Sequence, residues 1–264
     1  MERHYAPRTY ARAEDGVPNG TAERLDDMTR RIAERADSLA QEAPTRRSLD
    51  LGCGDGRLVA ALAARGWDAE GLETDPTAAD LARRRTGRPV HAGTLETLAL
   101  PEGAYGCVTL VHVLEHLPDP PATLAGVRRL LAPGGVLFVA VPNAGSAEAA
   151  LFRSCWYPLD LPRHFWGFTP HTLVRLVEQA GFCAGSVRHF PLVNTLQSLR
   201  YAVRALEGKP IGDEGAEERP ASDPAGSLRT RIFRASQDLG EGLGRFLPGE
   251  VMELHAFRTG EPAP

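Results

Sequence analysis

Two histidines and a glutamate stand close together in the stretch TLVHVLEHLPDP, residues 109–120. Their spacing, His112-x-x-Glu115-His116, is the inverted zincin pattern, in which two imidazoles bind zinc and the glutamate acts as general base. That chemistry needs both histidines on one face of a helix. Here an apolar strand ends near His112 and prolines follow His116 closely, so we expect no helix across the pattern. No third ligand is evident nearby, and we therefore predict that the chain holds no metal ion.

A second stretch with chemical potential is LDLGCGDG, residues 49–56, in which an apolar strand runs into Gly52, Gly54 and Gly56. Glycines let the backbone bend sharply and approach a ligand closely. The amide groups at the start of the following helix would face whatever lies over the turn. The spacing is G-x-G-x-G and differs from the dinucleotide fingerprint G-x-G-x-x-G. A tight turn without a ligand is the alternative interpretation.

An acidic residue, Glu73, follows at the end of the next expected strand. A carboxylate in that place can accept hydrogen bonds from both hydroxyl groups of a ribose. A surface acid near a helix start is the alternative, but the strand end and the spacing from Gly54 favour the ribose.

The elements that must position these residues alternate between apolar strands and helices. Such alternation predicts a parallel sheet with helices on both faces, and right-handed crossovers make it doubly wound. Ligands of such sheets bind beyond the carboxyl ends of the strands. The expected strands are 48–52, 68–73, 89–93, 106–113 and 136–142, and the expected helices between them are 56–66, 76–85 and 120–135.

Further elements flank this core. An amphipathic helix precedes it, and a capped helix, a strand, an apolar stripe, a polar loop, a second amphipathic helix and a last strand follow it. In chain order these are 21–42, 169–181, 186–190, 192–206, 208–226, 227–247 and 250–258.

Four motifs in one order carry a resemblance to a known family. LDLGCGDG, GLETDP, VTLVHVLEHLPDP and LAPGGVLFVAVPN match the consecutive motifs of class I S-adenosylmethionine-dependent methyltransferases, over about residues 48–181. The run DLPRHFWGFTPHTLVRLVEQAGF is similar to the small-molecule subgroup, which includes ubiquinone-biosynthesis-like and natural-product enzymes. The resemblance implies an α/β, Rossmann-like fold with a seven-stranded sheet. Its last strand, 250–258, would insert antiparallel between two neighbours.

The resemblance also implies which residues contact the cofactor, S-adenosyl-L-methionine. The ribose would bind Glu73, and backbone near His112 would contact the methionine end of the cofactor. The family often has an acid after the third strand that binds adenine; here that position is Thr94, with Leu95 and Glu96 as further candidates. The full cofactor-binding set is Asp50, Gly52, Cys53, Gly54, Gly56, Glu73, Thr74, Thr94, Leu95, Val111 and His112.

The acceptor side of such an enzyme is expected in the aromatic-rich segment 152–168, which surrounds His164. Methyl transfer mainly requires alignment of the two reactants and exclusion of water. For an oxygen acceptor, His164 is the candidate general base, with His112 as the next candidate, because imidazole changes charge near neutral pH. A loop pinned by its aromatic side chains, with a structural His164, is the alternative.

Composition restricts the partners. The net charge of −4 and the absence of a strongly basic region disfavour nucleic acid. No apolar run is long enough to span a membrane, and the four cysteines form no paired motif, which favours a reducing cytoplasm. We expect an enzyme that methylates a small-molecule acceptor. A cofactor-binding domain without catalysis, or methylation of a protein or nucleic acid, are the alternatives.

The chain divides into four expected parts: an N-terminal helical lid (1–47), the S-adenosylmethionine-binding core (48–190), a helical insertion with a flexible loop (191–249), and the final strand with its tail (250–264). The amphipathic stripes of the insertion could cover the acceptor, rest on a membrane surface or form a homodimer.

Overall fold

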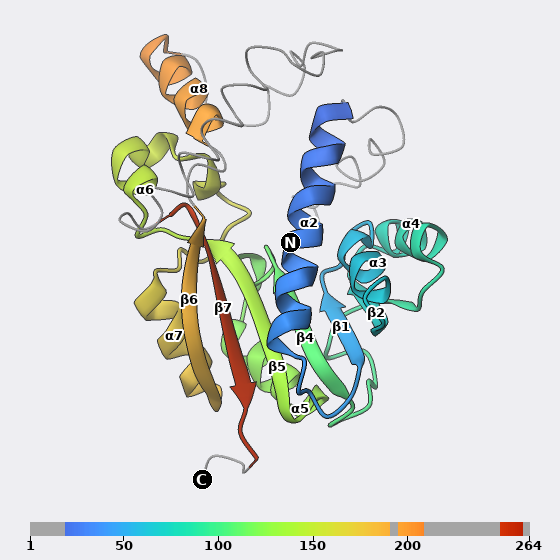
Figure 1. Ribbon diagram of the computed structural model, residues 1–264. Coiled ribbons are helices and arrows are strands. Elements are labelled where there is room, and N and C mark those ends of the chain that lie inside the picture. The colour runs from blue at the N-terminus through green and yellow to red at the C-terminus, as the bar shows by residue number, and fades with distance from the viewer. Residues whose placement is uncertain (1–18, 191–194, 209–248, 261–264) are drawn as a thin grey trace.

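A seven-stranded sheet forms the centre of the computed structural model, which describes residues 19–190, 195–208 and 249–260 (Figure 1). The strand order is β3-β2-β1-β4-β5-β7-β6. Strand β7 pairs antiparallel with both β5 and β6, while the pairings among the other strands are parallel. The expected α/β fold, including the inserted antiparallel last strand, is confirmed. The strands are β1 (Arg47–Leu51), β2 (Asp68–Glu73), β3 (Val90–Ala92), β4 (Tyr105–Val111), β5 (Leu131–Pro142), β6 (Phe182–Phe190) and β7 (Val251–Arg258).

Helices cover both faces of the sheet because both faces of its central strands are apolar. In β5, Leu137 and Val139 point into the cluster that also holds residues of α5 and α7, whereas Phe138 and Ala140 point into the cluster shared with α2, α3 and α4. This is the alternation that a strand buried on both sides requires. The helices are α2 (Asn19–Leu39), α3 (Arg57–Ala63), α4 (Pro76–Thr86), α5 (Pro120–Leu130), α6 (Ala147–Phe152), α7 (Pro170–Gln179) and α8 (Thr195–Leu206).

Side-chain caps explain where several helices begin. Asp75 accepts a hydrogen bond from the Thr77 amide before α4, and Asp119 accepts one from the Ala122 amide before α5. Thr169 forms a capping box with the third residue of α7, as expected from its position before a proline. These caps satisfy amides that the helix itself leaves without partners.

Helix α5 ends well before the predicted boundary, whereas the other described helices differ from their expected ranges by a few residues at an end. The helix expected over 120–135 ends at Leu130, and β5 begins at Leu131 with a partner in Tyr105. Pro133 lacks an amide hydrogen and disfavours a helical residue before it, so the chain leaves the helix early. Gly134, with a φ of 80°, then makes a bend inside β5.

Helix α2 lies across one face of the sheet, where Figure 1 shows it in front of β4 and β5. Ile32, Ala33 and Ala36 are buried in the same apolar cluster as α3. Ion pairs add to this contact: Arg57 of α3 binds Asp26 at 2.5 Å, and other pairs join α2 to the core. The described part of the expected N-terminal unit therefore shares the hydrophobic core of the sheet.

The expected insertion is described only in part. Helix α8 confirms the helical stripe within 192–206, and it packs against the 3₁₀ turns η2 (Arg153–Cys155) and η3 (Tyr157–Leu159). The Tyr157 amide donates to Ser198 Oγ at 2.9 Å, which fixes this contact. The expected helix 227–247 and residues 209–226 of the expected loop lie outside the described residues. Among the described helices, none is long and apolar enough to cross a bilayer.

Candidate active site

The glycine-rich turn after β1 has the strained backbone that its composition predicts. Gly52, Gly54 and Gly56 all have positive φ angles, of 69°, 53° and 80°. A Cβ atom on Gly52 would lie 2.6 Å from Val113 Cγ2, so this position accepts only glycine without rearrangement. Gly52 is nevertheless exposed between two buried neighbours. Its backbone is therefore accessible at the carboxyl edge of the sheet, where a ligand of this fold binds.

Glu73 connects this turn to the end of β2. It is 7% exposed, and its Oε2 accepts a hydrogen bond from the Gly54 amide at 2.9 Å. Its Oε1 accepts from the amides of Thr74, at 2.8 Å, and Asp75, at 3.1 Å. Each carboxylate oxygen has two lone pairs, and both on Oε1 are used by these amides, so Oε2 keeps one lone pair for a further hydroxyl donor. Glu73 and Gly54 lie together as the sequence predicted.

Two further residues of the expected cofactor set, Asp50 and Cys53, are buried. Asp50 Oδ1 accepts a hydrogen bond from Thr109 Oγ1 at 2.6 Å. Burial raises the pKa of Asp50 to about 7, although the bond from Thr109 opposes this shift. Burial also raises the pKa of the Cys53 thiol far above its ordinary value, so this side chain stays neutral. Both residues shape the floor of the glycine turn, with their side chains turned into the protein.

Thr94 and Leu95 follow the end of β3, beside Glu73. The Gly93 amide donates to the Glu73 carbonyl at 2.9 Å, which holds the two strand ends together. The Thr94 amide donates to Thr97 Oγ1 at 2.9 Å, and the Leu95 side chain packs against the core. The structure thus brings Thr94 to the same edge as Glu73, while the Leu95 side chain has a packing role.

Val111 ends β4, and His112 makes the sharp turn that follows. His112 has a φ of 55°, which is uncommon for a residue with a side chain. Its amide donates to the Ala140 carbonyl at 2.9 Å, and its Nδ1 lies 3.4 Å from Glu115 Oε1. The turn places His112 at the carboxyl edge, next to the glycine turn, and directs it toward Glu115.

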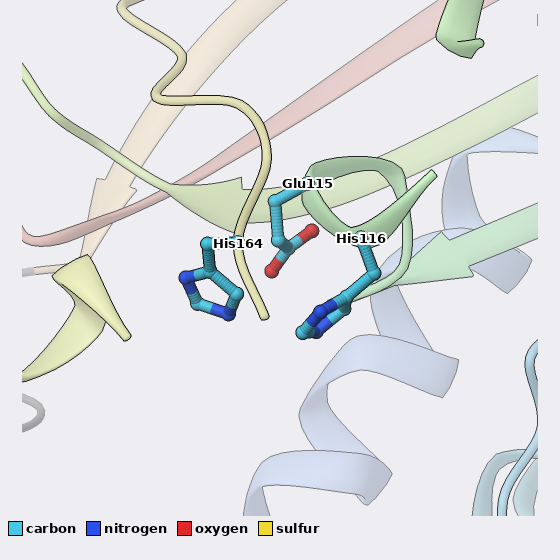
Figure 2. Close-up of side chains that lie close together, drawn as sticks. All are labelled: Glu115, His116 and His164. Atoms are coloured by element: carbon cyan, nitrogen blue, oxygen red, sulfur yellow. The ribbon is translucent and has the colours of Figure 1, made fainter. Parts of the chain in front are cut away.

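Three side chains converge near this turn: Glu115 and His116 from the 3₁₀ turn η1 (Leu114–His116), and His164 from the aromatic segment (Figure 2). Their ligand atoms all lie within 4.8 Å of one another, and the two imidazole centroids are 4.5 Å apart. Hydrogen bonds hold the segment in place: the Phe165 amide donates to the Glu115 carbonyl at 2.9 Å, and Trp166 Nε1 donates to the Leu117 carbonyl at 2.8 Å. We refer to Glu115, His116 and His164 as the His–Glu cluster.

Backbone carbonyl groups set the orientation of both rings in the cluster. His164 Nδ1 lies 2.7 Å from the Pro158 carbonyl, and His116 Nδ1 lies 3.1 Å from the Arg163 carbonyl. A carbonyl only accepts, so in each neutral ring Nδ1 carries the proton and Nε2 carries the lone pair. Burial lowers the pKa of His116, which favours the neutral ring at pH 7.

Glu115 is the charged member of the cluster. It is 1% exposed. Burial opposes its ionisation, but the contacts of its carboxylate with the His112 and His116 imidazoles outweigh burial, so the pKa of Glu115 is lowered. The carboxylate therefore stays ionised in the protein interior at neutral pH. Such a cluster can accept a proton, orient a hydroxyl group or ligate a cation.

Sequence reasoning missed this cluster although it singled out all three residues. The absence of an α-helix across the zincin pattern is confirmed, because η1 spans only three residues. The structure instead brings His164, which lies far along the chain, next to Glu115 and His116 through the folded aromatic segment, and His112 of the zincin pattern is not a member of this group. No local pattern reveals that contact, since it depends on how the segment docks against η1.

Only some aromatic side chains of the segment 152–168 are exposed, whereas others are buried in the protein. Trp156 and Phe168 are 6% and 5% exposed and pack into the protein, whereas Phe165 and Trp166 are 52% and 45% exposed. The buried pair anchors the segment, as the structural interpretation of His164 expects. The exposed pair directly follows His164 in the chain and is accessible to a bound molecule.

Comparisons with known proteins identify the family. Residues 22–184 match the model of a methyltransferase domain. The chain is 30% identical to malonyl-[acyl-carrier protein] O-methyltransferase of Serratia marcescens, over 69% of this chain and 70% of the relative. It is 33% identical to a ubiquinone biosynthesis O-methyltransferase of Cereibacter sphaeroides, over 60% of this chain and 70% of the relative.

A solved structure shares the fold. An S-adenosylmethionine-dependent methyltransferase from Archaeoglobus fulgidus superposes with a TM-score of 0.57 at 18% sequence identity, covering 88% of this chain and 94% of that one. The glycine turn, Glu73 and Thr94 lie at the carboxyl edge of the sheet, the edge at which open α/β sheets bind their ligands. The chain therefore belongs to the methyltransferase domain family and is an S-adenosylmethionine-dependent methyltransferase.

Proposed function

We propose that the enzyme methylates an oxygen atom of a small-molecule acceptor, and that His164 is the residue that activates this oxygen. The observation that carries the proposal is the placement of His164, which joins Glu115 and His116 near the carboxyl edge of β4. Two relatives whose names specify O-methyltransferases support an oxygen acceptor.

The His–Glu cluster favours a hydroxyl over a carboxylate as acceptor. A carboxylate has lost its proton at pH 7 and needs no activation, whereas a phenol, with a pKa near 10, keeps its proton. Residues that remove or displace a proton therefore help only when the acceptor is a hydroxyl group such as that of a phenol. Exposed Phe165 and Trp166 provide apolar surface for the ring that would carry such a hydroxyl.

The two ends of the site have separate tasks. S-adenosylmethionine, when bound, supplies an activated methyl group on a sulfonium. Glu73 would hold the ribose, and the exposed backbone of Gly52 would lie against the cofactor. His164 would orient the acceptor oxygen from the opposite side and displace its proton, because its Nδ1 is held by the Pro158 carbonyl and its lone pair is on Nε2.

His112 is the second candidate for the same role. It follows β4 directly, and the Glu115 carboxylate lies 3.4 Å from its Nδ1. A carboxylate beside one ring nitrogen fixes the tautomer of the imidazole and therefore which nitrogen faces the substrate. Direct comparison of the two histidines decides between them.

The test is a pair of conservative variants, His164→Gln and His112→Gln, with His171→Gln as the control on the exposed surface of α7. Formation of S-adenosylhomocysteine is measured with a panel of phenols, catechols and malonyl thioesters. We expect turnover with a phenolic acceptor, and a loss of about 10²–10⁴-fold in kcat for His164→Gln, the usual range for acid–base catalysis.

Cofactor affinity separates catalysis from folding in this experiment. Calorimetry should give the same affinity for S-adenosylhomocysteine in His164→Gln and the parent, because His164 is not among the residues proposed to contact the cofactor. Near-normal kcat in His164→Gln together with a large loss in His112→Gln would move the role to His112. Turnover of the malonyl thioesters alone would refute the hydroxyl acceptor.

A further inference from the structure

We propose that the His–Glu cluster is a binding site for a divalent transition-metal cation, and that this cation is how His164 activates the acceptor oxygen. The second part rests on the proposed function, because it requires an oxygen acceptor near His164. The metal site itself rests on the geometry of Glu115, His116 and His164 alone.

The first argument is the donor set. The cluster offers two imidazole nitrogens and one carboxylate oxygen, and this set leaves other coordination positions for water or substrate. Imidazole ligands suit zinc, copper, iron and nickel, whereas magnesium and manganese prefer oxygen ligands. A borderline transition metal is therefore the expected occupant.

The second argument is an uncompensated charge. Glu115 is 1% exposed, and within the described part of the chain neither of its carboxylate oxygens has a hydrogen-bond partner. His112 Nδ1, at 3.4 Å, gives one oxygen an electrostatic contact and no more. A buried carboxylate without hydrogen bonds is costly, and a cation bound between Glu115 and the imidazoles would remove that cost.

The third argument is the support behind each ring. A histidine that binds a metal usually donates its other ring hydrogen to a carbonyl or carboxylate, which fixes the tautomer. Both rings have this support: His164 at the Pro158 carbonyl, 2.7 Å away, and His116 at the Arg163 carbonyl, 3.1 Å away. Each lone pair is thus left on Nε2, the nitrogen that would bind the cation.

The three ligand atoms need to move only a short distance to reach the spacing of ligands around a bound metal ion. Ligand atoms around a tetrahedral ion with bonds of about 2.1 Å lie about 3.4 Å apart. The three ligand atoms here lie within 4.8 Å of one another, so each pair would approach by at most about 1.4 Å. Rotation of the two half-buried imidazoles can supply this movement, while buried Glu115 stays in place.

The chemistry balances without a redox partner. A hydroxyl oxygen that coordinates the cation loses its proton near neutral pH, as metal-bound water does, and the proton passes to solvent. The resulting oxygen forms the new bond to the methyl carbon as the bond from carbon to sulfur breaks. The products are the methyl ether and neutral S-adenosylhomocysteine, and the cation is unchanged.

Metal binding is measured directly, without reference to activity. The full-length protein is freed of metal with a chelator and titrated calorimetrically with Zn²⁺, Mn²⁺ and Mg²⁺. We expect one Zn²⁺ site per chain, weaker Mn²⁺ binding and the weakest Mg²⁺ binding. His164→Ala and His116→Ala should each weaken Zn²⁺ binding by at least about 10-fold, because loss of a residue that only supports a metal ligand already costs about 10–100-fold. His171→Ala should bind like the parent.

Two spectroscopic measurements distinguish binding at the cluster from binding elsewhere and from misfolding of a variant. Co²⁺ in the site should give visible absorption bands that disappear in Glu115→Gln, and circular dichroism checks that each variant is folded. Equal Zn²⁺ affinity in the parent and both histidine variants, or no binding at all, would overturn the metal site.

The two proposals can fail separately. If no metal binds but His164→Gln loses kcat, His164 acts directly as a base and the metal proposal is wrong. If metal binds at the cluster but hydroxyl acceptors are not methylated, the metal site stands and the oxygen acceptor is wrong.

Discussion

Replacement of Glu73 by alanine tests the cofactor site most directly. Glu73 has two structural tasks that differ in their consequences: it would bind the ribose, and it accepts the amide of Gly54 at 2.9 Å. A hydrogen bond to a charged group contributes about 1.5–3 kcal/mol. Loss of even one such bond to the ribose should weaken cofactor affinity by at least about 10-fold.

The same substitution should also destabilise the protein by a predictable amount. Thr74 and Asp75 lie near the surface, so water can replace Glu73 at their amides, but Gly54 is buried. An unpaired buried amide costs about 1–3 kcal/mol. For a chain of this size that corresponds to a fall of about 2–4 °C in Tm for each kcal/mol.

The assay is calorimetric titration with S-adenosylhomocysteine, combined with thermal unfolding of each variant. Glu102→Ala is the control, because Glu102 is a glutamate with a side chain 71% exposed, in the loop that precedes β4. A Glu73→Ala protein that is destabilised yet binds the cofactor like the parent would refute the ribose assignment and leave Glu73 as a support for the glycine turn.

Two further predictions concern stability. Gly52→Ala should destabilise the protein more than Gly66→Ala: both glycines have positive φ, at 69° and 84°, but only Gly52 would place a Cβ 2.6 Å from Val113, an overpacking cost of about 1–3 kcal/mol. Equal losses on urea unfolding would contradict this. Burial raises the pKa of Glu253 to about 7 against the pull of Arg35 and Arg188, so its contribution to stability is present below the unfolded-state pKa and is lost as the pH rises through 7. The free energy of unfolding of Glu253→Gln should therefore exceed that of the parent by up to about 3 kcal/mol at pH 8 and should equal it at pH 4. Urea unfolding across that pH range measures this difference. A difference that does not change with pH would exclude the pKa shift.

The fold was predictable because each of its signals is local. Each local pattern predicts one element: the apolar runs at 48–52 and 68–73 predict strands, the glycines after them predict turns, and a proline at a first turn predicts the start of a helix. The alternation of strands and helices is compatible with few topologies. The boundary of α5 was not predictable from periodicity, since Pro133 shortens a helix whose apolar pattern continues past Leu130.

In the candidate site, the proximity of Glu73 to Gly54 was predictable, whereas the proximity of His164 to His116 was not. Glu73 and Gly54 follow neighbouring strands, and parallel strands bring their carboxyl ends together. His164 meets His116 through a non-repetitive segment whose path depends on hydrogen bonds from Phe165 and Trp166 to η1. Contacts of an irregular segment leave no repeating pattern in the sequence. His164 could therefore be singled out from the sequence, but the residues that it contacts could not.

The position of β7 in the sheet determines when β6 can pair during folding, because β7 is the last strand in the chain. Strands β1 to β5 are complete once residues up to Pro142 are available, but β6 has β7 as its sheet partner, and residues 191–250 separate the two. The Asn143 amide, at the start of the segment that leads to His164, donates to the Glu250 carbonyl at 2.7 Å, just before β7. During synthesis on the ribosome, strands β1 to β5 can therefore pair early, whereas β6 and the start of the segment that carries His164 gain these partners only when the last strand enters the sheet.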